Sequence, residues 1–566
     1  MKKIFLFGLS LLVLCASCQK DFLNITPTNS ITDDAVWASS GSALLFVNDV
    51  YNSLSGPLYN FTAGDGLGNH MFDFAFTDDV VDNNNAWNQF EFTPSNVASL
   101  VTDRWTPCYT SIRKTNLGIE KITAATDIGQ DDKNRLLGDL HFLRGMFYFE
   151  LFRFYGGVPI ITKALDRKTD TIFNARNTAE ETLQFIISEF KAAADNLPVT
   201  APTAELGRAT KGAAIGMQAV TYLYGAGVVD SKYYANAAEM SNVLINGELA
   251  NTYKLFPDFT SLFLEQNENS SEAIFDIQYA YPYKFSGFQT VAAPPQPGPG
   301  NDYGWGWSYL TEDLAEAFEM KDGSKFDPKN LNEANNPFQN RDERFYGTFL
   351  YNDEAWKGTT LYTSTNVWDS VNKKFVQNSP NGLYNTGSAS ETITGYYLRK
   401  HMNEAVADGY ANRGLGVGGG CNVMVLRYAE ILLTYAEAQN EVSGADQSVY
   451  KAINLVRERA HQPDLPNGLS QSEMRERIHN ERRVELAIEN KRWFDIQRLK
   501  EGNKYLNGPI HGMNVTYIKD NDGKITPTYT KFTVLNKVFT APKDYLLPIP
   551  QNVMDRNPKL VQNPGW

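Results

Sequence analysis

The chain has 566 residues, and its 65 acidic residues outnumber 52 lysines and arginines, which gives a formal charge of −13. This acidity excludes a nucleic-acid-binding protein, because contact with phosphates requires a basic surface, and it excludes docking on a membrane through a polybasic patch. Only four cysteines occur, too few for a disulfide-based scaffold.

The first residues have the pattern of an export signal. Two lysines precede the apolar run 4–14, which is too short to span a bilayer but fits the core of a signal peptide. Small residues then allow cleavage before Cys18, so we expect a signal peptide over 1–17 and a lipid-anchored tether over 18–33. The alternative is ordinary secretion with Cys18 kept as a free thiol, because Cys15 stands where a lipobox usually has leucine. No later apolar run is long enough to cross a membrane.

Helical periodicity dominates the N-terminal half of the chain. The predicted helices cover residues 34–54, 98–124, 131–156, 178–196, 209–226 and 232–246. Small and large apolar residues are mixed in the helix 209–226, which contains Ala213, Gly216 and Ala219 and can therefore approach its neighbours closely. Antiparallel helix pairs of this kind look like degenerate tetratricopeptide units.

The composition changes between residues 251 and 425. Proline and glycine clusters at 294–300 and 414–420 interrupt any long element, and tyrosine and tryptophan are scattered among asparagine, aspartate, serine and threonine. We expect a loop-rich insertion with short strands that packs on the helical scaffold.

Helical patterning then returns, and the predicted helices cover residues 426–441, 447–460 and 471–500. The last of them is unusually rich in charge. Within it Glu489 and Arg492 are three positions apart, as are Asp495 and Arg498, so each pair could meet on one helix face. We interpret these charges as a structural ion network rather than a catalytic group. Farther on, an Asp-Asn-Asp-Gly sequence at 520–523 lies between two β-type runs and predicts a hairpin.

Motifs of the common enzyme classes do not occur. The chain has no HExxH zinc motif, no GxSxG nucleophile elbow and no GxxxxGK[ST] phosphate loop, and its six histidines are dispersed. The aspartates before Gly523 mimic the centre of a calcium loop, but Tyr529 stands where the bidentate glutamate belongs. Paired carboxylates hydrolyse glycosides in many enzymes, yet spacing singles out no pair here. We therefore expect no catalytic residues, no cofactor and no metal ion. Cys108 and Cys421 could pair in an exported protein, which the sequence alone does not decide.

Several long motifs resemble those of the SusD/RagB family, and they keep their order along the chain. These motifs lie at 141–149, 155–159, 426–440, 452–460, 481–498, 547–550 and 557–566. The resemblance implies a mainly α fold, in which tetratricopeptide-type helix pairs form a scaffold with a loop-rich insertion containing short strands. It implies one SusD-like domain over 34–566, made of an N-terminal helical half at 34–250, the insertion at 251–425 and a C-terminal helical signature region at 426–566.

The resemblance also implies a function. Members of the family are outer-membrane lipoproteins of Bacteroidota that bind nutrients and cover a SusC-like TonB-dependent transporter barrel as a lid. We therefore expect a surface-exposed lipoprotein, anchored through Cys18, that binds a glycan or oligosaccharide and is not an enzyme. Two alternatives are a surface glycoside hydrolase, which would release products from a glycan, and a repeat-based adhesin or scaffold, which would not co-purify with a barrel.

One candidate ligand-binding segment is the amide-rich loop at residues 82–89. Sugars present apolar C–H faces to aromatic rings and hydroxyl groups to amides and carboxylates. Trp87 lies among such polar residues, with Asn85 and Asn88 beside it. SusD-like proteins tend to carry a ligand-stacking tryptophan in this loop, so the resemblance makes Trp87 the first candidate. The alternative is that Trp87 packs on the protein surface.

The second candidate segment is residues 301–307, where aromatic residues alternate with glycine and polar residues. Tyr303 and Trp307 are candidates for contact with the ligand. The Gly-Trp-Gly sequence around Trp305 recurs in the family, which suggests a structural role for that tryptophan. Packing on the protein surface is again the alternative for Tyr303 and Trp307.

Overall fold

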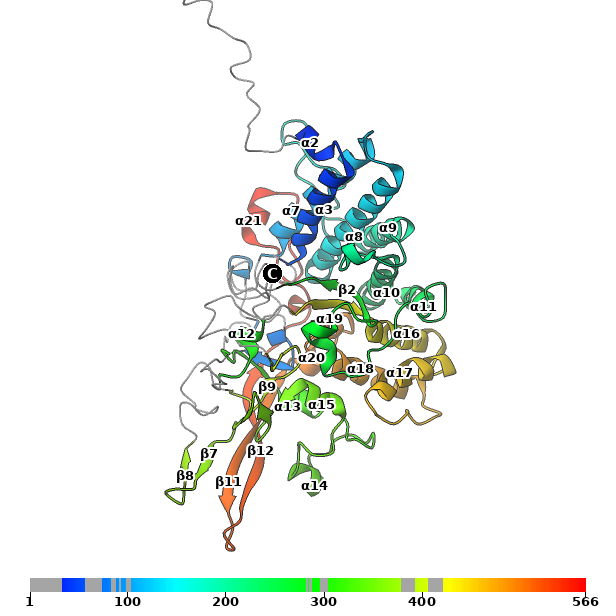
Figure 1. The fold of residues 1–566 in the computed structure, drawn as a ribbon. Coiled ribbons are helices and arrows are strands. Elements are labelled where there is room, and N and C mark those ends of the chain that lie inside the picture. Colours follow the sequence, from blue (N-terminus) through cyan, green and yellow to red (C-terminus); the bar gives the residue numbers. More distant parts are fainter. Residues whose placement is uncertain are drawn as a thin grey trace, which may run out of the picture.

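The computed structural model of the chain describes residues 33–55, 74–82, 88–90, 93–97, 103–280, 284, 288–295, 304–377, 392–405 and 421–566. Helices form one side of the molecule (Figure 1). The scaffold helices are α2 (Asp33–Trp37), α3 (Ser40–Asn52), α7 (Trp105–Ala124), α8 (Gln130–Tyr155), α9 (Ala179–Asn196), α10 (Lys211–Val228), α11 (Tyr233–Ile245), α16 (Tyr428–Ser443), α17 (Gln447–Arg459) and α18 (Gln471–Glu485). From α7 to α11 each helix packs on the next, and α11 packs on α16, which confirms the predicted scaffold of helix pairs.

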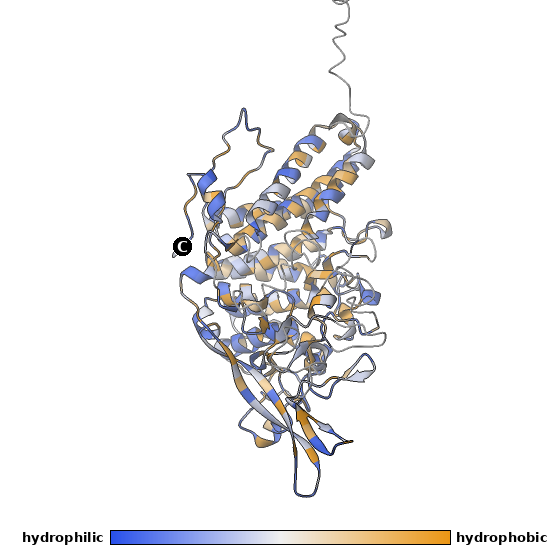
Figure 2. Ribbon diagram, turned by 90° about the vertical axis from the view of Figure 1, so that its left-hand side faces the viewer, coloured by the Kyte–Doolittle hydropathy of each residue, from blue (hydrophilic) through white to orange (hydrophobic). Residues whose placement is uncertain are grey.

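Local signals explain where these helices begin and how closely they pack. The hydroxyl of Thr178 accepts a hydrogen bond from the backbone N–H of Glu181 at the start of α9, and the Glu181 carboxylate accepts one from Thr178 N–H. In α10, a Cβ atom on Gly216 would lie 2.6 Å from Leu426 Cδ2, and one on Gly225 would lie 2.6 Å from Leu183 Cδ2. Both glycines are therefore needed for close approach. Apolar and polar residues alternate along the scaffold helices, as Figure 2 shows.

Two predicted helices in the N-terminal and C-terminal parts are broken in the structure. Residues 34–54 form α2 and α3, because Ser39 caps α3 by accepting a hydrogen bond from Ser42 N–H. Residues 471–500 form α18 and a separate α19 (Arg492–Arg498). Between them Ile488 and Asn490 have φ angles of 60° and 58°, values that end a right-handed helix. The prediction of one continuous helix over 471–500 is therefore wrong.

The insertion between α11 and α16 consists of short elements, as predicted. Its helices are α12 (Phe288–Ala292), α13 (Glu312–Ala315), α14 (Leu331–Ala334) and α15 (Glu343–Thr348), with 3-10 turns at Ser261–Phe263 and Glu265–Asn267. Its strands are β2 (Ala273–Ile277), β3 (Ser308–Leu310), β4 (Phe349–Leu350), β5 (Ala355–Trp356), β6 (Thr359–Thr360), β7 (Asn366–Asp369), β8 (Lys374–Gln377) and β9 (Tyr397–Leu398). Tyr309, Phe345 and Trp356 are fully buried in a separate hydrophobic core, which Val484 and Ile488 from the C-terminal region help to fill.

A two-stranded antiparallel sheet joins the two ends of the insertion. Strand β2 near its start pairs with β10 (Val423–Arg427) at its end, with Val423 opposite Ile277 and Arg427 opposite Ala273. The chain therefore leaves and re-enters the helical scaffold at one place. Leu426 and Arg427 belong to this sheet, so helix α16 begins two residues later than the predicted start at 426.

The C-terminal region ends in a long hairpin and a few short elements. Strands β11 (Gly508–Lys519) and β12 (Ile525–Lys537) pair along their whole length, which confirms the predicted hairpin, and they project from the body of the molecule (Figures 1 and 2). Asp520 Oδ1 accepts hydrogen bonds from the N–H groups of Asp522 and Lys524 in the turn. The remaining elements are β1 (Val80–Asp82), α20 (Gly502–Tyr505) and α21 (Gln551–Arg556), with 3-10 turns at Thr203–Glu205 and Lys543–Tyr545.

Two further features bear on the cysteines and on the membrane. Cys108 and Cys421 are both free thiols, so they do not form the disulfide that an exported protein could have had. Among the helices of the described residues, none combines the length and the apolar character that spanning a bilayer requires.

Candidate functional site

Strand pairing brings together the two segments that the sequence singled out independently. In the antiparallel pair β1–β3, Asp82 lies opposite Ser308 and Val80 lies opposite Leu310. Ser308 Oγ donates a hydrogen bond of 3.1 Å to Asp82 Oδ2, and both residues are buried. The end of β1 and the start of β3 therefore lie side by side, and both candidate segments adjoin this end of the strand pair.

Asn88 closes the base of the amide-rich loop. Its Oδ1 accepts a hydrogen bond of 3.0 Å from Asp82 N–H, and its Nδ2 donates one of 2.6 Å to the Asp82 carbonyl. The side chain is only 1% exposed, so in this structure its amide positions the loop, and a direct contact between Asn88 and a ligand stays a prediction. Among the other predicted residues, Cys18, Asn85, Trp87 and Tyr303 lie outside the described residues.

Trp305 and Trp307 form a tilted pair beside this loop base. Their ring centroids are 4.7 Å apart at an interplanar angle of 42°, and both side chains are half-buried against the insertion core. Their backbone N–H groups donate to the carbonyl oxygens of Thr290 and Val291 in α12, at 2.8 and 3.0 Å. A Cβ atom on Gly304 would lie 2.3 Å from a carbonyl oxygen of the facing backbone, so this approach requires glycine. The pair is thus held rigidly while part of it faces outward.

Two arginines hold the other end of strand β1. Arg492 makes two parallel hydrogen bonds to the carboxylate of Asp78, each 2.9 Å long, and Arg483 Nε donates to Asp79 Oδ1 at 2.8 Å. Burial alone would raise the pKa of Asp78, but the neighbouring guanidinium groups of Arg483 and Arg492 lower it to about 2. Sequence spacing did not indicate these pairs, because the partners are about 400 positions apart.

The charged residues of the predicted ion network do form ion pairs, but some of their partners differ from the prediction. Asp495 and Arg498 pair at 2.8 Å as expected. Glu489 does not pair with Arg492 and instead binds Arg427 and Lys400, at 2.7 and 2.6 Å. Because α18 ends before Glu489, the spacing of three residues no longer places it on a shared helix face with Arg492.

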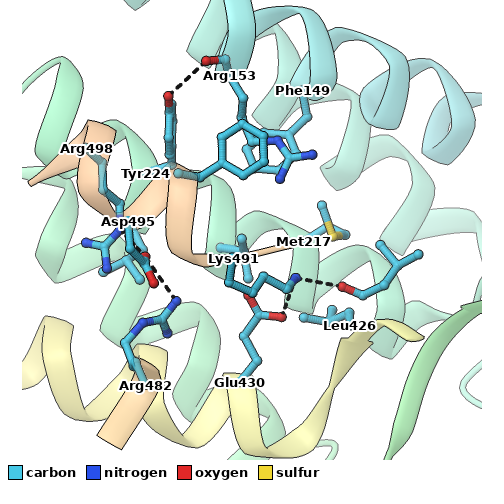
Figure 3. A pocket seen from close by; sticks show the side chains of 14 residues that line it. Phe149, Arg153, Met217, Tyr224, Leu426, Glu430, Arg482, Lys491, Asp495 and Arg498 are labelled. Atoms are coloured by element: carbon cyan, nitrogen blue, oxygen red, sulfur yellow. Dashed lines mark hydrogen bonds and ion pairs between the residues drawn. The ribbon is translucent and has the colours of Figure 1, made fainter. Parts of the chain in front are cut away.

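A small pocket, shown in Figure 3, lies within this charged region. Its volume is about 40 Å³, enough for water molecules but too small for a sugar ring. Lys491 bridges Glu430 and the Val425 carbonyl in its wall, at 2.8 and 2.9 Å. Charged side chains around this pocket pair with one another, and the volume is too small for a glycan.

Two buried acids have raised pKa values. Burial raises the pKa of Glu312 to about 7 and that of Asp276 to about 8, values that suit a general acid. However, the two side chains are only 2% and 4% exposed, so a polysaccharide could not reach them.

Two family models match the chain. The model described as "SusD family" matches residues 266–566, which is more than half of the chain. The model described as "Starch-binding associating with outer membrane" matches residues 21–223. Among curated proteins, SusD-like protein P2 of Formosa agariphila is 26% identical over 496 residues, covering 84% of this chain and 82% of that protein. SusD-like protein P38 of the same organism is 23% identical over 545 residues, covering 91% of this chain and 95% of that protein.

Solved structures share the fold over nearly the whole chain. A SusD-like protein from Bacteroides fragilis matches with a TM-score of 0.76 and 26% identity, covering 96% of this chain and all of that one. A SusD-like carbohydrate binding protein from the same species matches with a TM-score of 0.74 and 25% identity, covering 93% of this chain and 99% of that one. A laminarin binding SusD-like protein matches with a TM-score of 0.65 and 19% identity over 93% of this chain and 99% of that one, and it shows the shared fold alone.

Proposed function

The chain belongs to the SusD family, and from this premise we propose that it is a surface glycan-binding lipoprotein that captures oligosaccharides for a TonB-dependent transporter. The observation that carries this proposal is the β1–β3 strand pair, because the amide-rich loop and the tryptophan segment both adjoin the same end of it. One relative with the same fold is described as a carbohydrate binding protein.

Each part of this site has a role in binding a sugar. The flat faces of Trp87, Tyr303 and Trp307 would stack on the C–H faces of sugar rings, and the amide of Asn85 would bind ring hydroxyls. Asn88 would act by holding the base of the loop that carries Trp87. In this proposal the site retains a glycan without cleaving it.

Binding of soluble glycans by the purified protein tests this function. Laminarin, starch, xyloglucan, mannan, pectic galactan and chondroitin sulfate can be screened by affinity electrophoresis and then by calorimetry, with product release followed by chromatography. We expect saturable binding to at least one glycan and no new reducing ends. Released oligosaccharides would favour the hydrolase alternative, and the absence of binding to every glycan would contradict the proposal.

The partner in this proposal is a SusC-like transporter barrel. The family resemblance and the description of one matching model as associating with the outer membrane support this partnership. Mild detergent extraction and affinity purification of the tagged protein should recover a barrel protein of TonB-dependent type. Recovery without any such barrel would favour the adhesin or scaffold alternative.

Replacement of Cys18 by alanine should move the protein from the membrane fraction to the soluble fraction. The reason is that acyl chains bind membranes through burial of about 0.8 kcal/mol per CH₂ group, and a variant without the thiol cannot be acylated. Labelled palmitate incorporation and fractionation measure the effect, with Cys108→Ala as the control because that buried thiol is no acylation site. A Cys18→Ala protein that still carries palmitate in the membrane would contradict this assignment.

A further inference from the structure

Arg483 and Arg492 join the helical region to the strand that starts the proposed binding site. Arg483 Nη2 lies 2.8 Å from Asp78 Oδ2 and 2.7 Å from Asp79 Oδ1, so one guanidinium group binds both carboxylates. Arg492 binds Asp78 through two parallel hydrogen bonds, a geometry that fixes orientation as well as distance. The two aspartates are 5% and 4% exposed in their side chains, so these are buried contacts.

A continuous series of hydrogen bonds and strand pairing connects Asp78 and Asp79 to the tryptophan pair. The carbonyl of Asp78 accepts a hydrogen bond of 2.6 Å from the Thr311 hydroxyl, and the carbonyl of Asp79 accepts one of 3.1 Å from Thr311 N–H. The β1–β3 register continues from there to Asp82 and Ser308, which is the residue directly after Trp307. Strand β1 itself covers Val80–Asp82, so Asp78 and Asp79 directly precede it.

The other contacts of these arginines also fix their position. The guanidinium carbon of Arg492 lies 4.2 Å from the ring centroid of Tyr505 in α20, so the side chain is held between an aromatic ring and a carboxylate. Arg483 is on α18 and Arg492 starts α19, on either side of the break at residues 486–491. Through these two arginines, Asp78 and Asp79 are held in position relative to both α18 and α19.

We infer that Arg483 and Arg492 are positioning residues of the glycan site, which set the alignment of β1 and β3 and through them the Trp305–Trp307 pair. This inference rests on the proposed function for its effect on affinity, but its structural half is independent of any ligand. If these ion pairs only stabilised the fold, removing one would lower the stability and leave the geometry of the tryptophan pair unchanged.

A ligand-free measurement separates these two roles. The full-length protein labelled with 5-fluorotryptophan gives fluorine resonances for its nine tryptophans, and Trp305→Phe and Trp307→Phe assign the pair. We expect Arg492→Met and Asp78→Asn, which break the same ion pair from opposite sides, to shift both assigned resonances. Arg492→Lys, which keeps the positive charge, should restore them in part.

The matched control is Arg144→Met in the scaffold. Arg144 also makes two hydrogen bonds to one carboxylate, that of Glu189, at 2.7 and 2.8 Å between side chains that are each 6% exposed. This variant should lower the melting temperature without moving the two tryptophan resonances. Unmoved resonances in Arg492→Met and Asp78→Asn, together with a lowered melting temperature, would overturn the inference.

Affinity provides the second measurement. For the screened glycan with the lowest Kd, Arg492→Met should weaken binding by about 2- to 30-fold, the usual range for coupling through a contiguous network. In a Trp307→Ala background Arg492→Met should have little further effect on affinity, because the ring that Arg492 is proposed to position is absent. If Arg492→Met weakened binding equally in the wild-type and Trp307→Ala proteins, Arg492 would not act through Trp307, and the inference would be overturned. If the wild-type protein binds no glycan, the proposed function fails, while the fluorine shifts still decide the positioning role.

Discussion

Replacement of Arg427 by methionine is expected to lower the free energy of unfolding by about 3–5 kcal/mol, the usual cost of removing one partner from a buried ion pair. The guanidinium group of Arg427 lies 2.6 Å from Glu272, 2.6 Å from Glu485 and 2.7 Å from Glu489. All four side chains are at most 2% exposed. Methionine keeps most of the length of the side chain but removes one counter-charge from each carboxylate, and among the described residues only Arg344, Arg459 and Lys400 still pair with them.

The same network makes stability depend on acid pH. Burial alone would raise the pKa of Glu485 and Glu489, but the neighbouring cations lower it well below the usual range for Glu485 and to about 2 for Glu489. A depressed folded-state pKa gives stability that is present above the unfolded-state value of about 4.3 and is lost as the pH falls through the folded-state value. The wild-type protein should therefore lose stability between about pH 4 and pH 2, and Arg427→Met should lose it at higher pH.

Denaturant unfolding at pH 7 and melting curves from pH 7 to pH 2 measure both effects. The control is Lys191→Met, which removes an i,i+4 pair with Asp195 whose side chains are 68% and 62% exposed. This variant should change the stability by no more than about 0.5 kcal/mol, since exposed pairs are weak. A loss of under 1 kcal/mol in Arg427→Met would contradict the expectation that this buried network stabilises the fold.

Replacement of Trp87 by alanine is expected to weaken glycan binding by about 5- to 150-fold, which corresponds to the roughly 1–3 kcal/mol of a lost ring-stacking contact. The amide-rich sequence around Trp87 offers no apolar periodicity that burial would explain. Tyr303→Ala and Trp307→Ala should weaken binding less, because Trp87 is the first candidate for stacking on the sugar ring. Calorimetry with the best-binding glycan of the screen measures all three.

Trp87→Phe is the matched control, because it retains an aromatic face of smaller area and should keep part of the affinity. None of the three alanine variants should change the circular dichroism spectrum. Wild-type affinity in all three would place the binding site elsewhere, for instance on the loops of residues 360–410, and would also remove the reason to treat the β1–β3 end as the site.

Charged residues of the C-terminal region contact two different parts of the fold. Arg427, Glu485 and Glu489 connect the β2–β10 junction to the C-terminal region, where the insertion leaves the scaffold. Arg483 and Arg492 connect the C-terminal region to β1, where the proposed site begins. The charged residues that the sequence presents as one segment thus serve two different parts of the fold.

The sequence by itself determined most of the helices, the loop-rich insertion and the hairpin, because the signals for these elements are local. The capping box of Thr178 and Glu181, the small residues of α10 and the turn at residues 520–523 each act within a few positions of the chain. The candidate segments of the site were also found locally, since aromatic residues in polar loops stand out from the surrounding composition.

Only the tertiary structure decided which of these parts meet. Asp82 and Ser308 are 226 positions apart, and Arg492 and Asp78 are 414 apart, so no spacing rule relates them. The partner of Glu489 could not be predicted for the same reason: local spacing favoured Arg492, but the positive φ angles at Ile488 and Asn490 end the helix and turn Glu489 toward Arg427. A charged side chain that leaves water must find its counter-charge wherever the fold places one, and that position is set by packing of the whole chain.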